Sequence, residues 1–106
     1  MDDLKWTKAE KHIARRAFDT ACRREYDAVR AKLKEMAAAA SGPEDVWEIH
    51  NYLSDVLKDM EEKYDYRYSC LLLLFTRLMR KGWLSEADLD GLGDDKTAPI
   101  KYVLSL

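Results

Sequence analysis

The chain has 106 residues, of which 47% are hydrophobic and 36% charged, and its formal net charge is −2. This length fits one domain, and the hydrophobic share is too high for a chain that stays disordered. A balanced, slightly acidic composition excludes a protein that binds nucleic acid or a membrane surface through its overall charge.

The N-terminus, the apolar runs and the cysteines all favour a cytoplasmic protein. Asp2 and Asp3 give the N-terminus the wrong charge for a secretory leader, and the longest wholly apolar run, residues 70–75, is too short to insert across a membrane. Cys22 and Cys70 lie far apart in the sequence, as expected in a reducing compartment. We expect both thiols to be buried and unpaired, with a disulfide between them as the alternative.

A long helix is predicted near the N-terminus, after a frayed tail over residues 1–5. Thr7 and Glu10 have the spacing of a capping box, and the helical pattern continues to about Ala39. Apolar residues recur every three or four positions: Ile13, Ala14, Ala17, Phe18, Ala21, Cys22, Tyr26, Val29, Leu33, Met36 and Ala37. Such a helix is about 48 Å long, whereas a compact domain of this size has a radius of gyration of roughly 13 Å. Its apolar stripe therefore needs an equally long partner helix and, we expect, a second subunit.

The strongest break in the sequence separates this helix from a second one. Gly42 is predicted to end the first helix in a left-handed conformation, and Pro43 suits the first turn of the next, which runs to about Lys63. The second helix carries one apolar stripe: Val46, Ile49, His50, Leu53, Val56, Leu57, Met60 and Tyr64. Trp47 and His50 lie one turn apart on its edge. Because the connection is so short, the two helices are expected to be antiparallel neighbours.

A third helix is predicted over residues 66–81. Asp65 can cap it, and Gly82 can end it in a left-handed conformation. The run from Leu71 to Phe75 makes this helix apolar all round, so we expect it to be the central buried element.

Two shorter helices are predicted at the C-terminal end. Ser85 and Asp88 can cap the first of them. Asp94 or Asp95 can cap the last helix, which tolerates Pro99 only within its first turn. No segment alternates with period two, so the fold class is all-α: residues 1–106 form a single domain, with a long antiparallel helical hairpin arm over 1–65 and a small helical head over 66–106, assembled as a homodimer.

Residue types that carry chemistry do not form a recognisable set. His12 and His50 are the two histidines, and no cysteine or carboxylate cluster completes a metal site with them. There is no nucleophile–base motif and no glycine-rich phosphate loop. We therefore predict no catalytic, cofactor or metal site. The pairs Arg15–Arg16 and Arg23–Arg24 are interpreted as a solvated face, with a surface for nucleic acid or an acidic partner as the alternative.

Several motifs are similar to those of the cyanobacterial fluorescence recovery protein family. The central motif is Trp47-x-x-His50-x-Tyr52-Leu53-Ser54, followed by Tyr64-Asp65-x-Arg67. Other matching segments extend over nearly the whole chain: Trp6-Thr7-x-Ala9-Glu10, Ala17-Phe18, Arg24-Glu25, Asp95-Lys96 and Ile100-Lys101. We therefore identify the chain, by resemblance, as a member of this family or of its relatives.

The resemblance implies a non-enzymatic, all-helical homodimer. In the family, the dimer binds photoactivated orange carotenoid protein and speeds its return to the resting state, which ends energy quenching at the phycobilisome. Carried over by motif, the dimer and partner interface comprises Trp47, His50, Asn51, Leu53, Ser54 and Leu57. The corresponding partner surface on the head comprises Leu73, Lys96, Pro99 and Lys101. No nucleic acid partner and no membrane insertion are implied.

The chain departs from the family pattern at four of these positions. Asn51 stands where the family has Asp, and Leu57 stands where it has Arg, so an acid and a base are lost together. Leu73 replaces an aromatic residue and Pro99 replaces a lysine. Replacing both members of an ion pair can preserve an interface, so we expect the dimer to persist. Because charge complementarity selects partners, the alternative is a relative with the same scaffold and a different protein partner.

Overall fold

A computed structural model describes residues 4–106 and contains helices but no strand over that range. The predicted N-terminal tail lies outside the described residues at positions 1–3. The elements in chain order are α1 (Lys8–Ala39), α2 (Pro43–Lys63), α3 (Tyr68–Lys81), the 3₁₀ helix η1 (Glu86–Leu89) and α4 (Asp94–Leu104). The all-α class is confirmed.

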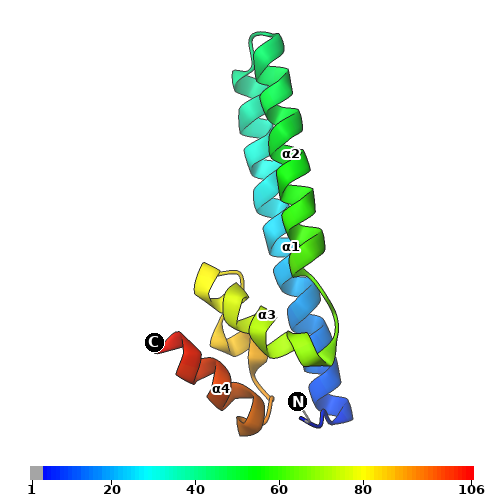
Figure 1. Ribbon diagram of the computed structural model, residues 1–106, viewed down its shortest axis with the longest axis vertical. Helices are drawn as coiled ribbons and strands as arrows, with labels where there is room; N and C mark the ends of the chain where they lie inside the picture. Colours follow the sequence, from blue (N-terminus) through cyan, green and yellow to red (C-terminus); the bar gives the residue numbers. More distant parts are fainter. Residues whose placement is uncertain (1–3) are drawn as a thin grey trace.

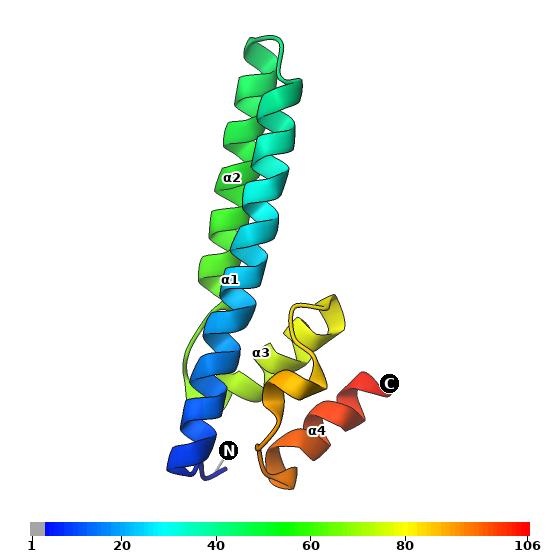
Figure 2. The same ribbon diagram turned by 180° about the vertical axis from the view of Figure 1, so that it is seen from behind.

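Helices α1 and α2 form a long antiparallel hairpin, and the remaining helices gather beside the N-terminal half of α1 (Figures 1 and 2). The longest principal axis is 53 Å and the radius of gyration is 16.9 Å. A compact chain of this length would have a radius of gyration of roughly 13 Å. The hairpin therefore extends well beyond the packed part of the molecule, as the predicted helix lengths require.

The hydrophobic core lies in the head and includes the N-terminal half of α1. Three alanines on one face of α1 are fully buried and let α3 and η1 approach closely: Ala14, Ala17 and Ala21. Eight larger side chains complete the core: Leu71, Leu74, Phe75, Leu78, Leu84, Leu89, Leu92 and Ile100. In the structure the head thus takes in part of the segment that the sequence assigned to the arm, residues 1–65. Below we use "arm" for the hairpin beyond Ala21 and "head" for the rest.

Three of the predicted helix ends are confirmed by the structure, and the one at Gly42 is not. The capping box of Thr7 and Glu10 is present, the Ser85–Asp88 box opens η1, and Gly82 ends α3 with φ +86°. The prediction for Gly42 was wrong: its φ is −146°, an extended conformation. The chain leaves α1 through Ala40 instead, and Gly42 serves as the N-cap of α2.

Helix α3 differs from its prediction at its start and on one face. It begins at Tyr68 after an Arg67 N-cap, and Asp65 does not cap it because its carboxylate pairs with the Arg67 guanidinium instead. Four of its apolar residues are buried against α1 and α4, but Leu73 is 60% exposed. The helix is therefore central without being buried all round.

Helix α4 corrects the predictions for its cap and its proline. Its N-cap is Gly93, without a side-chain cap from Asp94 or Asp95. Pro99 is the sixth helical residue, beyond the first turn. Proline has no backbone N–H, so Pro99 cannot form the helical hydrogen bond to the carbonyl of Asp95. Both residues lie on the exposed side of α4, where water is available to that carbonyl.

The remaining expectations concern the thiols and the membrane. Cys22 and Cys70 are both free, so the disulfide alternative is excluded, but each is half-buried and not part of the inner core. Burial raises the pKa of the Cys22 thiol, and the nearby Glu25 carboxylate raises it further. Among the described residues, no helix combines the length and the apolar character needed to cross a membrane.

Candidate functional site

Helix α2 carries apolar side chains on two adjoining faces. Ile49, Val56 and Met60 face α1, and Met60 is the one residue of the helix that is fully buried. Val46, Trp47 and Leu57 point outward and are 58%, 64% and 51% exposed. The apolar surface of α2 is thus wider than α1 covers. Exposed apolar surface of this kind, rimmed by charged residues, is typical of a protein–protein interface.

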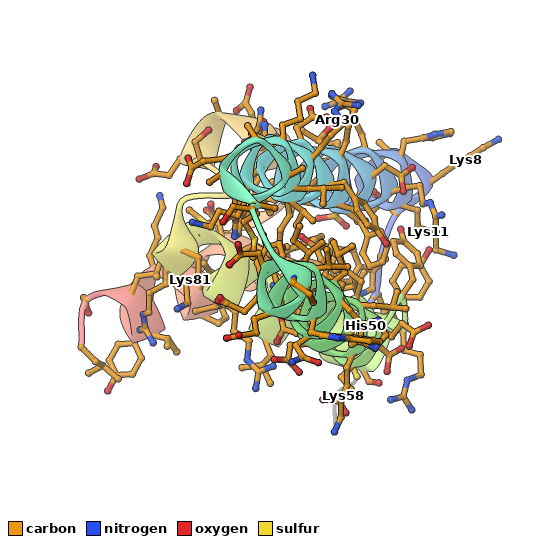
Figure 3. All side chains as sticks on the ribbon, turned by 90° about the horizontal axis from the view of Figure 1, so that it is seen from above. Lys8, Lys11, Arg30, His50, Lys58 and Lys81 are labelled. Carbon is orange, nitrogen blue, oxygen red and sulfur yellow. The ribbon has the colours of Figure 1, made fainter. Side chains whose placement is uncertain are left out.

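Trp47 and His50 lie at the centre of the exposed face. Their ring centroids are 6.2 Å apart and the rings are perpendicular, an edge-to-face arrangement. Figure 3 looks along the arm and shows His50 on the outer flank of α2, while Arg30 on α1 points the opposite way. Neither ring is tucked into a core, so the interpretation of this pair as core residues does not fit one copy of the chain.

The structure places the six residues predicted for the arm interface on one side of α2. Leu53 is half-buried at the border between the two faces, whereas His50, Asn51, Ser54 and Leu57 are exposed. Two further apolar residues on the exposed arm were not singled out. Val46 was assigned to the apolar stripe of the second helix and Tyr26 to that of the first, and both are exposed, at 58% and 49%. Periodicity places a residue on the apolar side of a helix but does not tell which neighbour covers it.

Of the four residues predicted for the head surface, three are exposed and one is not. Leu73, Pro99 and Lys101 are accessible. Lys96 is 2% exposed, so its assignment to a partner surface is corrected: it is an internal residue. It occupies the first turn of α4 and turns inward toward α1, where it meets a carboxylate 86 residues away.

The Lys96 ammonium is held by a buried network that ties the N-terminal segment, α1 and α4 together. Its Nζ lies 2.9 Å from Glu10 Oε1 and donates to the carbonyl of Lys5. Glu10 also accepts from the backbone N–H groups of Thr7 and Gly93, at 3.0 and 2.8 Å. The bond from the Thr7 N–H, followed by the bonds from Lys96 and from the Gly93 N–H, lowers the pKa of Glu10 to about 2. Burial alone would lower the pKa of Lys96, but its carboxylate partners outweigh burial and raise it.

A second network closes the junction between arm and head. Glu25 is 9% exposed and accepts from the Lys63 ammonium at 2.7 Å and from the Tyr64 hydroxyl at 2.8 Å. Burial, followed by the hydrogen bond to Glu25, raises the pKa of Tyr64, which stays a donor. Sequence spacing gives no sign of this contact, because the partners are 38 and 39 residues apart.

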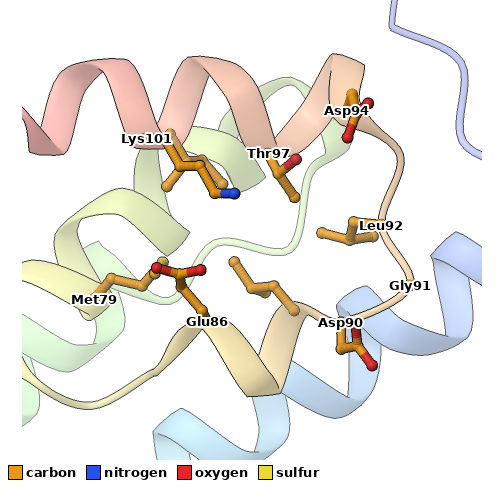
Figure 4. Close-up of a pocket in the computed structure, with 10 residues that line it drawn as sticks. Met79, Glu86, Asp90, Gly91, Leu92, Asp94, Thr97 and Lys101 are labelled. Atoms are coloured by element: carbon orange, nitrogen blue, oxygen red, sulfur yellow. The ribbon is translucent and has the colours of Figure 1, made fainter.

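The head also has a cleft of about 220 Å³ between η1 and α4 (Figure 4). Lys101 and Thr97 of α4 face Glu86 of η1 across it, and Met79 closes one end. Lys101 lines this cleft. A partner that contacts Lys101 there would therefore also contact the Glu86 carboxylate.

The chemistry of the described residues supports binding. Over residues 4–106, no three His, Cys, Asp or Glu side chains are arranged to hold a metal ion. The charged side chains that are buried form structural ion pairs: Glu10 with Lys96, and Glu25 with Lys63. On the arm, the face of α2 around Trp47 stays exposed among the described residues.

An all-helical chain with a long hairpin arm, a compact head and an open aromatic face on the arm defines a class of small helical proteins built to bind other proteins. Comparison with known proteins narrows this class. The family model described as "Photoprotection regulator fluorescence recovery protein" matches residues 6–104. The chain therefore belongs to the fluorescence recovery protein family.

Individual relatives agree in sequence and in fold. The fluorescence recovery protein of Synechocystis sp. is 31% identical over 101 residues, which cover 95% of this chain and 93% of that protein. The solved structure of the Fremyella diplosiphon protein has a TM-score of 0.88 at 38% identity, covering 95% of this chain and 98% of that one. The solved Synechocystis structure has a TM-score of 0.89 at 30% identity, covering 96% and 100%. Arm and head thus have the same relative arrangement in the family.

Proposed function

We propose that this protein is a non-enzymatic, cytoplasmic, homodimeric regulator that binds photoactivated orange carotenoid protein and accelerates its return to the resting state. The family is that of a photoprotection regulator, which supports the general role. The observation that carries the specific proposal is the exposed apolar face of α2 around Trp47 and His50. It contains the residues that the family resemblance assigns to dimerisation and activity.

The packing of the arm supports the proposed dimer. A two-helix hairpin has one seam, and in this arm that seam leaves Val46, Trp47 and Leu57 in water. A second copy laid on the same face would bury them in a four-helix bundle with a twofold axis. Positions 51 and 57 are six residues apart and do not neighbour one another on a helix. The acid and base that the family carries there would therefore pair between subunits, and their joint replacement leaves no stranded charge.

The test is a mixing assay with orange carotenoid protein. The carotenoid protein is converted to its red form by light, and the rate of return to the orange form is followed by absorbance in the dark. We expect the rate to rise with added protein until the carotenoid protein is saturated. A matched variant, Trp47→Ala, should raise the rate less at equal concentration. An unchanged rate in excess of the wild-type protein would contradict this function.

The second candidate is a regulator with the same scaffold and another protein partner. It is favoured by the exposure of all four positions at which the chain departs from the family pattern: Asn51, Leu57, Leu73 and Pro99. Changes on exposed positions alter what a partner meets while leaving the core intact. If this candidate holds, the double variant Asn51→Asp/Leu57→Arg does not gain relaxation activity. A gain of relaxation activity in that variant would favour the first candidate, a regulator of orange carotenoid protein.

A further inference from the structure

A basic surface covers the side of α1 that faces away from the head core. Lys8, Lys11, His12 and Arg15 follow one another at steps of three, one and three residues, which places them on one face of the helix. All four side chains are exposed. Figure 3 shows Lys8 and Lys11 projecting to the side opposite Lys81 of the head. We call these four residues the α1 basic surface.

This face has an aromatic wall from a distant part of the chain. The connection between α2 and α3 crosses α1 and places Tyr66 and Tyr68 beside the cations, so that together they line a shallow groove of about 270 Å³. The Arg15 guanidinium lies 4.6 Å from the centroid of the Tyr66 ring, and Lys11 Nζ lies 5.6 Å from that of Tyr68. Rings that contact cations in this way hold the positive groups in place and limit their side-chain freedom.

Among residues 4–106, carboxylates neutralise the positive charge of the groove only in part. Between residues 4 and 18 there is one carboxylate, Glu10, and it is buried on the opposite side of α1 with Lys96. Asp19 contacts Arg15 at 3.3 Å in an exposed pair, and Asp65 is paired with Arg67. Lys8 and Lys11 form no ion pair among the described residues. The groove thus carries a local excess of positive charge in a chain whose net charge is −2.

We propose that the α1 basic surface, with its Tyr66 and Tyr68 wall, is a docking site for an acidic peptide segment of a protein partner. The distance from position 8 to position 15 is about 10 Å, which an extended peptide of three or four residues spans. Asp and Glu side chains on such a segment would reach the ammonium groups of the two lysines and a bidentate position on Arg15.

The aromatic wall argues for a peptide over a single-stranded nucleic acid. Base stacking needs an open ring face. Tyr66 and Tyr68 meet each other edge to face with centroids 5.7 Å apart, Trp6 covers Tyr68 at 5.4 Å, and each tyrosine has a cation beside its ring. Little ring face is left for a base. The proposal requires neither the dimer nor the carotenoid protein, since it concerns a face of the head away from α2's exposed side chains.

The experiment is a titration of a fluorescein-labelled oligoglutamate peptide followed by anisotropy at about 50 mM salt, where charges over this distance are weakly screened. The variant Lys8→Gln/Lys11→Gln should weaken binding about thirtyfold, because two charge contacts of about 1 kcal/mol each in water are lost. Gln keeps helix propensity, and the folded state is checked by circular dichroism. A matched control on the arm, Lys32→Gln/Lys34→Gln, should change affinity less than about twofold.

A second measurement locates the peptide directly. In two-dimensional NMR of the ¹⁵N-labelled protein, the backbone amides of residues 8–15 and 66–68 should shift on titration, and those of the arm tip should not. Absence of saturable binding, an equal loss in the arm control, or shifts confined to another face would overturn the proposal. Tighter binding of an oligothymidylate of the same charge than of the peptide would also overturn it, in favour of a nucleic acid surface.

Discussion

The head and the arm of this molecule are built from similar helices but are stabilised differently. The head encloses eleven buried apolar residues from α1, α3, η1 and α4, and polar contacts join its elements. The arm has a single seam, with one fully buried side chain on α2 and none on α1 beyond Glu25. Apolar surface left in water contributes nothing to folding. The comparison indicates that the head core is closed within one chain, whereas the arm leaves apolar side chains exposed, as the proposed dimer would require.

The largest loss of stability is expected from a cavity in the head core. Phe75 is fully buried between α1 and the rest of the head, so Phe75→Ala removes its packing and leaves a cavity. We expect a loss of about 3 to 5 kcal/mol in the free energy of unfolding, measured by urea denaturation. Leu33→Ala, at a half-buried position in the arm, is the control and should cost less than about 2 kcal/mol. Equal losses would mean that the arm is packed as tightly as the head.

The next largest loss of stability is expected when a substitution removes one member of the buried ion pair of Glu10 and Lys96. Lys96→Met fills similar space but leaves the Glu10 carboxylate without its ammonium partner at a nearly inaccessible position. Breaking such a pair costs about 3 to 5 kcal/mol, and the double variant Glu10→Gln/Lys96→Met should recover part of the loss because no charge is stranded. Thermal unfolding of the wild type, Lys96→Met and the double variant measures both the loss and the recovery of stability. A double variant less stable than Lys96→Met would contradict this account.

The Glu10 carboxylate should make the free energy of unfolding depend on pH in the acid range. The folded-state pKa of Glu10 is about 2, below its ordinary value of 4.5, mainly because Thr7, Lys96 and Gly93 donate to the ionised form. The group therefore contributes stability above pH 4.5, and that contribution is lost as the pH falls toward 2. The stability difference between wild type and Glu10→Gln should narrow from about pH 6 to about pH 3 in urea titrations. A difference that is constant over this window would show that folding does not lower the pKa of Glu10.

On the arm, truncation should alter association more than folding. Trp47→Ala removes the largest exposed aromatic side chain from the proposed dimer face. A hot-spot residue contributes 2 kcal/mol or more, so the dissociation constant of the dimer should rise at least about thirtyfold. Light scattering over a dilution series measures it, with Glu48→Ala on the polar side of α2 as the control. A monomeric wild-type protein at high concentration would refute the dimer itself.

The parts of this fold that the sequence predicts are those with local causes. The bounds of α1 and α2, the Thr7–Glu10 capping box and the left-handed Gly82 each depend on residues within a few positions of one another. These signals are periodicity and end chemistry, which a single sequence carries in full. The residues around Trp47 were assigned to an interface by the family motif, and the structure leaves Trp47 and Leu57 exposed.

The parts that the sequence does not predict depend on contacts between distant residues. Lys96 matched a family motif and was assigned to the surface, but its partner Glu10 is 86 positions away, and only the folded head brings them together. The same holds for Glu25 and Tyr64 at the junction. The burial of Lys96 could not be predicted because the neighbouring sequence does not distinguish a buried lysine from an exposed one on a helix.

The smallest effects should come from two glycines that differ only in backbone conformation. A Cβ at Gly42 or at Gly82 would meet no atom within 4 Å, so steric contact cannot separate them. Gly82, at the end of α3 in the head, has φ +86°, where an L side chain is strained; Gly42, at the tip of the arm, is extended at φ −146°. We expect Gly82→Ala to cost about 1 to 2 kcal/mol. Gly42→Ala should lie within about 0.5 kcal/mol of neutral, since reduced freedom of the unfolded chain offsets the weaker N-cap. Chemical denaturation measures both, and equal costs would show that the arm tip adopts a left-handed turn in solution, as the sequence had suggested.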